Sequence, residues 1–290
     1  MSDFTAMKIG DMEAIYGGGF RRARASLGVT AFGLSTTDLP PNYDGVPAHS
    51  HRFDGQEELY VVVAGDGALE IEGDKVPVET GTLVRIAPGA RRRPIAGPNG
   101  IRLLIAGAAP GKAYEPFENS ELGKPEIPVQ ELRGVVEAAA GKAAGEDVEG
   151  ESLASNVVGE DVEGEALYSV AKVDDIEALT GYFQGVSLTP VRRALGIKAF
   201  GVGVMSVEGE DAEYPKHDHS KDGQEEVYIP ISGEAELDMG EHGKVLLTPG
   251  MMVRVAPEVT RTIVPGSGSV QVLALGGTPG AAYEPPQRKG

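Results

Sequence analysis

The sequence predicts an all-β protein made of two similar units, and three observations support this prediction. The chain has 290 residues, which is long enough for two domains of ordinary size that each bury a core of their own. It contains 41 glycines and 20 prolines but no tryptophan, a composition that favours strands and turns over long helices. The third observation is an internal repeat that spans most of both halves.

The repeat is visible as two segments that match at a constant offset. ASLGVTAFGLS, residues 25–35, aligns with RALGIKAFGVG, residues 193–203. After one inserted residue the match continues with GTLVRIAPGARR from Gly81 and GMMVRVAPEVTR from Gly250. A match sustained over this length indicates that each half is one folding unit.

Each unit contains short apolar segments that are typical of β-strands. ELYVVVAG, GTLVRIAP and IRLLIAG are rich in β-branched residues and are bounded by Gly or Pro. Strands that recur about every ten residues predict a sandwich or a barrel. We therefore expect one such unit in residues 1–120, a connector in residues 121–168 and a second unit in residues 169–290.

The connector has no counterpart before the first unit and is the most acidic part of the chain. VQELRGVVEAAAGKAAGE, which follows Pro128, has apolar residues near helical spacing and predicts one amphipathic helix. The motif GEDVEGE occurs at 145–151 and again at 159–165. Because LASNVV between the two copies resembles a strand, we favour a hairpin over a solvated linker.

Charge and composition restrict the partners and the chemistry. The chain has 44 acidic and 26 basic residues, and a net charge of −18 repels phosphate backbones and anionic lipid headgroups. We therefore expect no nucleic-acid partner and no membrane partner. The opening MSDFTAMKIGD lacks the pattern of a secretory signal, so we expect a cytoplasmic protein. Because there is no cysteine, a bound metal needs histidine, carboxylate or water ligands.

Four of the five histidines form two His-x-His pairs, one in each unit. On an extended segment, residues i and i+2 project to the same side, so each pair places two imidazoles together. A turn follows each pair, and the next strand opens with a glutamate that can complete a metal-binding set. The candidate ligands are His49, His51 and Glu58 in the first unit and His217, His219 and Glu226 in the second.

This pattern resembles the first sequence signature of the cupin superfamily. That signature has His-x-His, a short gap, a Glu, six residues and a Gly, and the six-residue spacing recurs from Glu58 to Gly65 and from Glu226 to Gly233. The second signature is similar to the segment from Gly81 to Pro88-Gly89 and to its copy. The resemblance implies two tandem double-stranded β-helix, or jelly-roll, barrels, and therefore a bicupin. It implies a fold and a site more than a reaction.

The chain departs from the family pattern in two ways that affect the site. The gap between the second His and the Glu is six residues instead of three or four, which leaves Gln56 and Gln224 as runner-up ligands. Where the family has its last His ligand, this chain has Arg92 and Arg261, and a guanidinium has no lone pair to offer a cation. Each arginine either binds an anionic substrate beside a metal or pairs with the glutamate in a metal-free barrel.

A tyrosine and an arginine also recur in both units, and we expect them to stabilise the fold instead of taking part in the chemistry. Tyr60 and Tyr228 follow the glutamates by two residues and share their face, so we expect them to belong to the core. Arg85 and Arg254 occupy equivalent places in the next strand, where an ion pair on the strand face is expected.

The resemblance implies a metal-dependent enzyme that acts on a small anionic organic compound, with dioxygenase, isomerase or decarboxylase chemistry. The cofactor would be a divalent metal ion, and the sequence does not distinguish iron, manganese, nickel and zinc. Arg92 and Arg261 are the candidate substrate-binding residues. The protein is compatible with assembly into a homodimer. Two alternatives remain, a non-enzymatic protein that binds a small molecule and a degenerate, metal-free bicupin.

Overall fold

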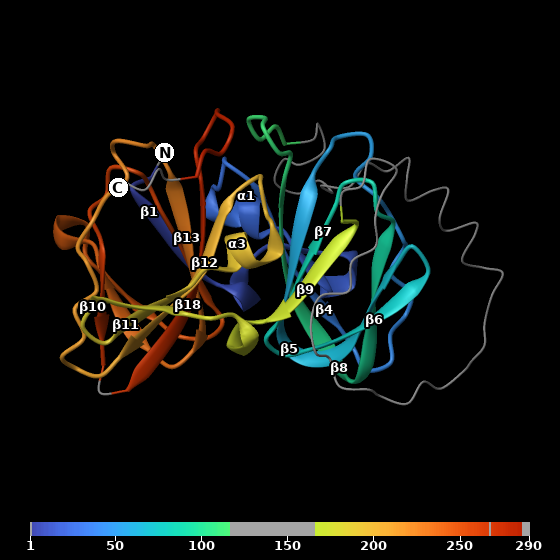
Figure 1. The fold of residues 1–290 in the computed structure, drawn as a ribbon, viewed down its shortest axis with the longest axis horizontal. Helices are drawn as coiled ribbons and strands as arrows, with labels where there is room; N and C mark the ends of the chain where they lie inside the picture. Colours follow the sequence, from blue (N-terminus) through green and yellow to red (C-terminus); the bar gives the residue numbers. More distant parts are fainter. Residues whose placement is uncertain (1, 117–165, 267, 286–290) are drawn as a thin grey trace.

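The structure, a computed structural model, describes residues 2–116, 166–266 and 268–285, and its regular elements are mostly β-strands. Figure 1 shows two barrels side by side, one made mainly from each half of the chain. This confirms the prediction of two tandem β-barrels. The helix and hairpin expected in the connector fall between residues 117 and 165, outside the described residues. Within the described part, every helix is too short or too polar to cross a membrane.

The strands of the two halves correspond in order, although two long strands of the first half are each replaced by two shorter strands in the second. Each begins with a strand, passes through a short turn of helix and then forms the long antiparallel strands of its barrel. The strands of the first half are β1 (Phe4–Lys8), β2 (Ala14–Ile15), β3 (Phe20–Arg21), β4 (Gly33–Leu39), β5 (Glu57–Ile71), β6 (Asp74–Glu79), β7 (Thr82–Ile86) and β8 (Arg92–Ala108). Those of the second half are β9 (Tyr168–Lys172), β10 (Leu179–Phe183), β11 (Val186–Thr189), β12 (Gly201–Glu208), β13 (Glu225–Ser232), β14 (Ala235–Asp238), β15 (Lys244–Leu247), β16 (Met251–Val255), β17 (Thr262–Pro265) and β18 (Ser269–Gly277).

Two five-residue helices lie between the barrels (Figure 1). They are α1 (Ala23–Leu27) and α3 (Val191–Leu195), and each ends at a glycine with a left-handed backbone, Gly28 or Gly196. A glycine adopts this conformation without steric cost, so it stops the helix after little more than one turn. Single turns of 3-10 helix occur at Ile9–Asp11, Tyr16–Gly18, Val173–Asp175 and Gly240–His242.

Each half contributes its first strand to the sheet of the other barrel. β1 pairs with β16 in antiparallel fashion, from Phe4 opposite Val255 to Lys8 opposite Met251. β9 pairs with β7 in the same way. In Figure 1, β1 therefore lies within the barrel of the second half, and β9 lies within that of the first. The expected boundaries at 120 and 169 did not include this exchange of strands.

Three hydrophobic clusters form the core, because the strands nearest the centre of the molecule bury both faces. Tyr60 and Val62 point into the first barrel, whereas Leu59 and Val61 point towards the second. The cluster between the barrels combines residues of both halves, and Phe32 and Phe200 meet there with their ring centroids 6.1 Å apart. Burying one side chain of this size stabilises the fold by about 1.5–3 kcal/mol. The two barrels are thus joined by a core of their own.

Buried glutamates also join the barrels, because each is paired with an arginine of its own half and accepts hydrogen bonds from the other half. Glu57 accepts hydrogen bonds through Oε1 from the backbone amides of Lys198 and Ala199 at 2.5 and 2.6 Å, while Arg85 Nε donates to its Oε2 at 2.9 Å. The expected ion pair of Arg85 is therefore present within the first half, and its glutamate also accepts hydrogen bonds from the other half. In the second barrel Glu225 pairs with Arg254 and accepts hydrogen bonds from the amides of Thr30 and Ala31 of the first half.

The glycine that follows each glutamate by seven positions has a steric reason. Gly65 has a φ of +81°, and a Cβ placed on it would lie 2.0 Å from the carbonyl oxygen of Gly100. Gly233 is equally restricted, with 1.8 Å to the carbonyl oxygen of Ser269. Any side chain there would push apart two paired strands, so the motif requires glycine.

Candidate metal centres

Each His-x-His segment is fixed by backbone hydrogen bonds to the segment that carries the arginine. His49 and Arg92 exchange two such bonds of 3.1 and 2.9 Å, and the amide of His51 donates to the carbonyl of Pro88 at 2.9 Å. The extended backbone places both imidazoles on one side, with ring centroids 5.6 Å apart. The corresponding residues of the second barrel are His217, His219, Pro257 and Arg261.

The Nδ1 atom of each of these histidines faces an oxygen atom outside the site. His51 Nδ1 lies 2.9 Å from a carboxylate oxygen of Asp54, and His49 Nδ1 lies 3.4 Å from the carbonyl oxygen of Pro47. A proton on Nδ1 satisfies these contacts and leaves the lone pair on Nε2, which is how metal-binding imidazoles are oriented. The matching contacts in the second barrel are His219 with Asp222 and His217 with Pro215, both at 3.0 Å.

The Nε2 atoms point towards the glutamate of the same barrel. His51 Nε2 lies 3.1 Å from Glu58 Oε1, and His219 Nε2 lies 3.4 Å from Glu226 Oε1. The ligand atoms of each trio are all within 4.8 Å of one another. Two ligands that bind one metal at right angles, with bonds of about 2.1 Å, are about 3 Å apart. The structure therefore brings together all three predicted ligands in both barrels.

Arg92 lies behind Glu58, and only 1% of its surface is exposed. Its Nε donates to Glu58 Oε2 at 2.9 Å, and its Nη2 donates to the same oxygen. Its Nη1 donates to the backbone carbonyls of Ala90 and His49 at 3.2 and 3.4 Å. The guanidinium is therefore engaged on all three nitrogens, and only Oε1 of the carboxylate is left facing His51.

Arg261 has the same position in the second barrel, where it contacts the glutamate and a tyrosine. Its Nη2 donates to Glu226 Oε2 at 2.7 Å, and its Nη1 donates to the carbonyl of Val259 at 2.9 Å. Its Nε donates to the hydroxyl of Tyr228 at 3.1 Å, and that hydroxyl donates to Glu226 Oε2. Of the two roles considered for the arginines, the structure places them in contact with the glutamates.

Comparisons with known proteins agree with this geometry. A family model described as "Cupin domain" matches residues 35–103, which include the first candidate site. A single-site mutant of oxalate decarboxylase from Bacillus subtilis superimposes with a TM-score of 0.60, 16% identity, and coverage of 96% of this chain and 78% of that chain. The chain therefore has a cupin domain in its first half and the fold of a bicupin.

Two other solved structures show the same fold over nearly the whole chain. The formate complex of oxalate decarboxylase from Lactobacillus farciminis has a TM-score of 0.60 and 14% identity, covering 96% of the bicupin and 87% of that chain. Protein Ylba from E. coli has a TM-score of 0.59 and 12% identity, covering 94% and 90%. No curated protein matches the sequence. At these identities the likeness concerns the fold alone.

The donor set of the bicupin fits a divalent metal. Two imidazole nitrogens and one carboxylate oxygen form the facial set of non-haem iron sites, which other divalent ions of the first transition series also accept. Glu58 can serve Arg92 through Oε2 and a metal through Oε1 at the same time. The arginine therefore leaves room for a metal, although it occupies the place of the family's last ligand.

The surroundings favour the forms of Glu58 and His49 that bind a metal, but they favour the protonated form of His51. Burial would raise the pKa of Glu58, but the charges of Arg92 and His51 outweigh burial and hold this pKa well below its usual range. Burial and then the charge of Arg92 lower the pKa of His49 to about 4, so this imidazole is neutral at physiological pH. Burial also opposes a charge on His51, but Glu58 and Asp54 outweigh it and raise the pKa of His51.

The runner-up ligands Gln56 and Gln224 contact the aspartates next to the histidines. The backbone and side-chain amides of Gln56 donate to the Asp54 carboxylate at 3.2 and 3.1 Å. Gln224 holds Asp222 in the same way, at 3.3 and 3.2 Å. The glutamines thus orient the carboxylates that orient the histidines, and such outer partners affect metal affinity.

A cavity of about 1130 Å³ in the first barrel leads to the candidate site. His49, His51 and Glu58 line one end of it, and Tyr60 lies beside them in the wall. Tyr60 is a buried core residue, as predicted, but it also borders the cavity. Arg92 is not part of the lining. A ligand in this cavity meets the two imidazoles and the glutamate before it can reach the arginine.

Sequence reasoning missed the aspartates and most of the cavity. Asp54 and Asp222 lie in the turns that follow the His-x-His pairs, and their recurrence at the same place in the repeat is the signal that could have found them. The cavity wall includes Tyr16, Phe20 and Tyr43. These residues lie in loops and very short strands, where no sequence periodicity indicates which side faces the barrel.

Proposed function

We propose that this bicupin is a metal-dependent enzyme that acts on a small organic molecule in its first barrel. His49 and His51 would hold a divalent metal through Nε2, and Glu58 would hold it through Oε1. His217, His219 and Glu226 would hold a second metal in the other barrel. The observation that carries the proposal is the convergence of two imidazole nitrogens and one carboxylate oxygen on residues that line a ligand-sized cavity.

A metal in the first site would act as a Lewis acid and would keep coordination positions open for a substrate or for dioxygen. Dioxygenase, isomerase and decarboxylase reactions are all compatible with this chemistry. Iron, manganese, nickel and zinc all accept this donor set.

We assign Arg92 the role of orienting Glu58. Its contacts hold Oε2 and thereby direct Oε1 towards His51. A substrate carboxylate that paired with Arg92 would have to replace Glu58, which would leave a buried carboxylate without its partner. An anionic oxygen of the substrate is therefore expected to meet the metal. The arginine contributes through the position of the ligand it holds, and Arg261 does the same for Glu226.

A metal-free binding protein is the second candidate, and one observation favours it. Arg92 already balances the charge of Glu58, and the raised pKa of His51 lets an imidazolium occupy the other side of the carboxylate. Such a barrel would be stable without a metal and would bind its ligand through the cavity wall alone.

Metal analysis of protein purified without a histidine tag separates the two candidates. We expect about one equivalent of metal per intact site, and less by one equivalent in His51→Ala. His242→Ala is the matched control, because His242 lies outside both sites and pairs with Asp3. Protein that stays metal-free after incubation with iron, manganese, nickel and zinc would favour the binding protein.

Turnover is tested next with the metal-loaded protein. The panel contains oxalate, which the names of two structural neighbours indicate as their substrate, together with aromatic acids and diketones. Oxygen uptake identifies a dioxygenase, carbon dioxide release without oxygen uptake identifies a decarboxylase, and a changed NMR spectrum with neither identifies an isomerase. His51→Ala must abolish the signal and His242→Ala must not.

A further inference from the structure

The cavity of the first barrel limits which molecules can be the ligand. We propose that it binds an elongated molecule with an uncharged, largely apolar body and a donor group at one end. The position of the donor group rests on the proposed function, because it would meet the metal held by His49, His51 and Glu58. The apolar body rests on the cavity wall alone.

The first step is the length of the cavity. Gly107 pairs with Glu58 across β8 and β5, and Ile101 pairs with Gly65 further along the same two strands. All four residues line the cavity. Six residues of strand correspond to about 20 Å, at about 3.3 Å per residue. The cavity therefore extends well beyond the candidate metal site, and its 1130 Å³ exceeds the need of a two- or three-carbon acid.

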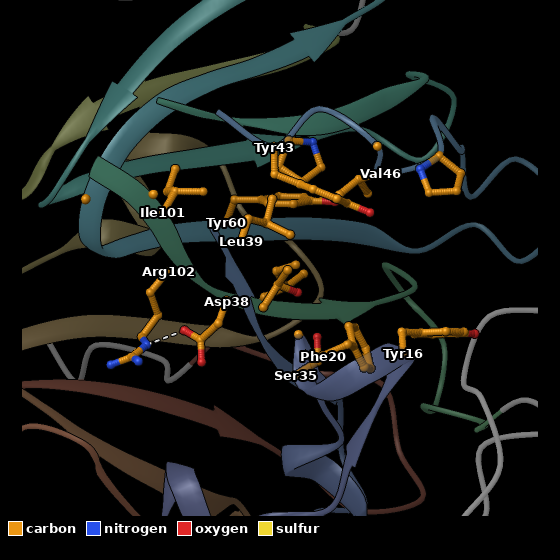
Figure 2. Close-up of a pocket in the computed structure, with 18 of the residues that line it drawn as sticks. Tyr16, Phe20, Ser35, Asp38, Leu39, Tyr43, Val46, Tyr60, Ile101 and Arg102 are labelled. Carbon is orange, nitrogen blue, oxygen red and sulfur yellow. Dashed lines mark hydrogen bonds and ion pairs between the residues drawn. The ribbon is translucent and has the colours of Figure 1, made fainter. Parts of the chain in front are cut away.

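The second step is the chemistry of the wall. Leu39, Tyr43, Val46 and Ile101 gather with Tyr60 around one part of the cavity (Figure 2). Such a wall offers contact area to an apolar ligand and few strong polar contacts.

A second group of aromatic residues lies at the turn before β3. Tyr16 and Phe20 both line the cavity, and their rings meet edge to face with centroids 6.3 Å apart (Figure 2). Between the two groups, Ser35 and Thr37 of β4 contribute hydroxyl groups to the lining. The body of the ligand is therefore expected to carry at most a few hydrogen-bonding groups.

The third step is the charge at the far end. Among the described lining residues, Arg102 and Asp38 are the charged pair away from the metal site, and the Arg102 Nε donates to Asp38 Oδ1 (Figure 2). Arg21 donates to the other oxygen of Asp38 at 2.7 Å. Since these charges are already paired with each other, a charged group on the ligand body would gain little there and would lose its hydration.

The body of the ligand is tested with N-phenyl-1-naphthylamine, a neutral aromatic dye that needs no metal. We expect saturable binding of one dye per chain, measured by fluorescence, with and without metal. Val46→Asp places a charge in the wall and should weaken binding at least tenfold. Val264→Asp is the control, because Val264 lies on an exposed strand of the other barrel and should leave binding unchanged. Thermal midpoints confirm that both variants fold.

The donor group is tested with a series of alkyl hydroxamates, which share one metal-binding head and differ in the tail. In the metal-loaded protein, octanohydroxamate should bind at least thirty times more tightly than acetohydroxamate, since a fully buried methylene gives about fourfold. Tyr43→Ala should reduce this ratio, whereas Tyr182→Ala, which changes an exposed tyrosine of the second half, should not.

The two arms separate the failure of this inference from the failure of the proposed function. If hydroxamate affinity does not change with tail length, or if Val46→Asp does not weaken dye binding, the proposal of an apolar ligand body is wrong even if the protein holds metal. Hydroxamates that fail to bind at any length, together with dye binding that depends on Val46, overturn the metal-dependent function and leave the apolar body supported.

Discussion

Glu57 and Glu58 are neighbours in β5, and their carboxylates act on opposite sides of the sheet. The side chain of Glu57 points out of the barrel and accepts hydrogen bonds from two backbone amides of the other half. The side chain of Glu58 points into the barrel and faces His51 and Arg92. Alternation along a strand explains the difference. Of these two adjacent residues, Glu57 therefore joins the barrels and Glu58 belongs to the candidate metal site.

Replacing Glu57 should affect stability and leave the site intact. Glu57→Ala removes the partner of buried Arg85 and of two amides, so we expect a loss of about 3–5 kcal/mol in the free energy of unfolding. Glu79→Ala is the control, because Glu79 pairs with Lys172 at the surface and should cost under about 1 kcal/mol. Chemical denaturation gives both values. Equal losses in the two variants would contradict the role of Glu57.

Replacing Arg92 tests what the arginine does. Arg92→Ala should destabilise the metal-free protein by about 3–5 kcal/mol, because it leaves Glu58 buried without its partner. A saturating divalent metal should recover part of this loss by restoring positive charge at Oε1. Arg91→Ala, an exposed neighbour, should change stability by less than about 0.5 kcal/mol. An unchanged unfolding curve for Arg92→Ala would show that the pair contributes little.

Arg92→His is the reciprocal experiment. It supplies the imidazole that the family has at this position, so we expect metal affinity to be retained or increased. Metal titration with a competing chelator measures the dissociation constants of both proteins. Weaker metal binding in Arg92→His would mean that orientation of Glu58 by the guanidinium outweighs a fourth ligand.

Metal binding in the first barrel should release one proton, that of His51, near neutral pH. His51 has a raised pKa and must lose its proton before it binds, whereas His49, with a pKa of about 4, is already neutral. As pH falls below the pKa of His51, the dissociation constant should rise about tenfold per unit. A hundredfold rise per unit between pH 5 and 6 would show that both histidines titrate together there.

The two sites should lose metal independently. His51→Ala and His219→Ala each remove one imidazole, and the two histidines belong to separate barrel interiors. Metal content should therefore fall by one equivalent in each single variant and by two in the double variant. If one substitution empties both barrels, the sites are coupled through the core that joins them.

Much of this structure follows from patterns that the repeat makes visible. Spacing and alternation predicted two strand-rich units, the two ligand trios and the ion pairs of Arg85 and Arg254, and the resemblance to cupins predicted the barrels. The partner of an arginine is harder to predict, because the side chain of Arg92 is long enough to reach either a bound ligand or Glu58. The choice depends on where its N–H groups lie in the folded protein. The barrel that receives β1 was equally hard to predict, since the residues of β1 do not indicate which sheet edge they pair with.

The exchanged strands β1 and β9 have a consequence for the origin of the molecule. The same pairing made between two copies of a single barrel would be a domain-swapped homodimer with two-fold symmetry. Joining two such chains end to end keeps every strand pairing and changes only the connectivity. Either half produced alone would lack the strand that covers β7 or β16, and its open sheet edge would pair with another chain. A gene fragment encoding one half is thus expected to yield dimers or aggregates in place of a folded monomer.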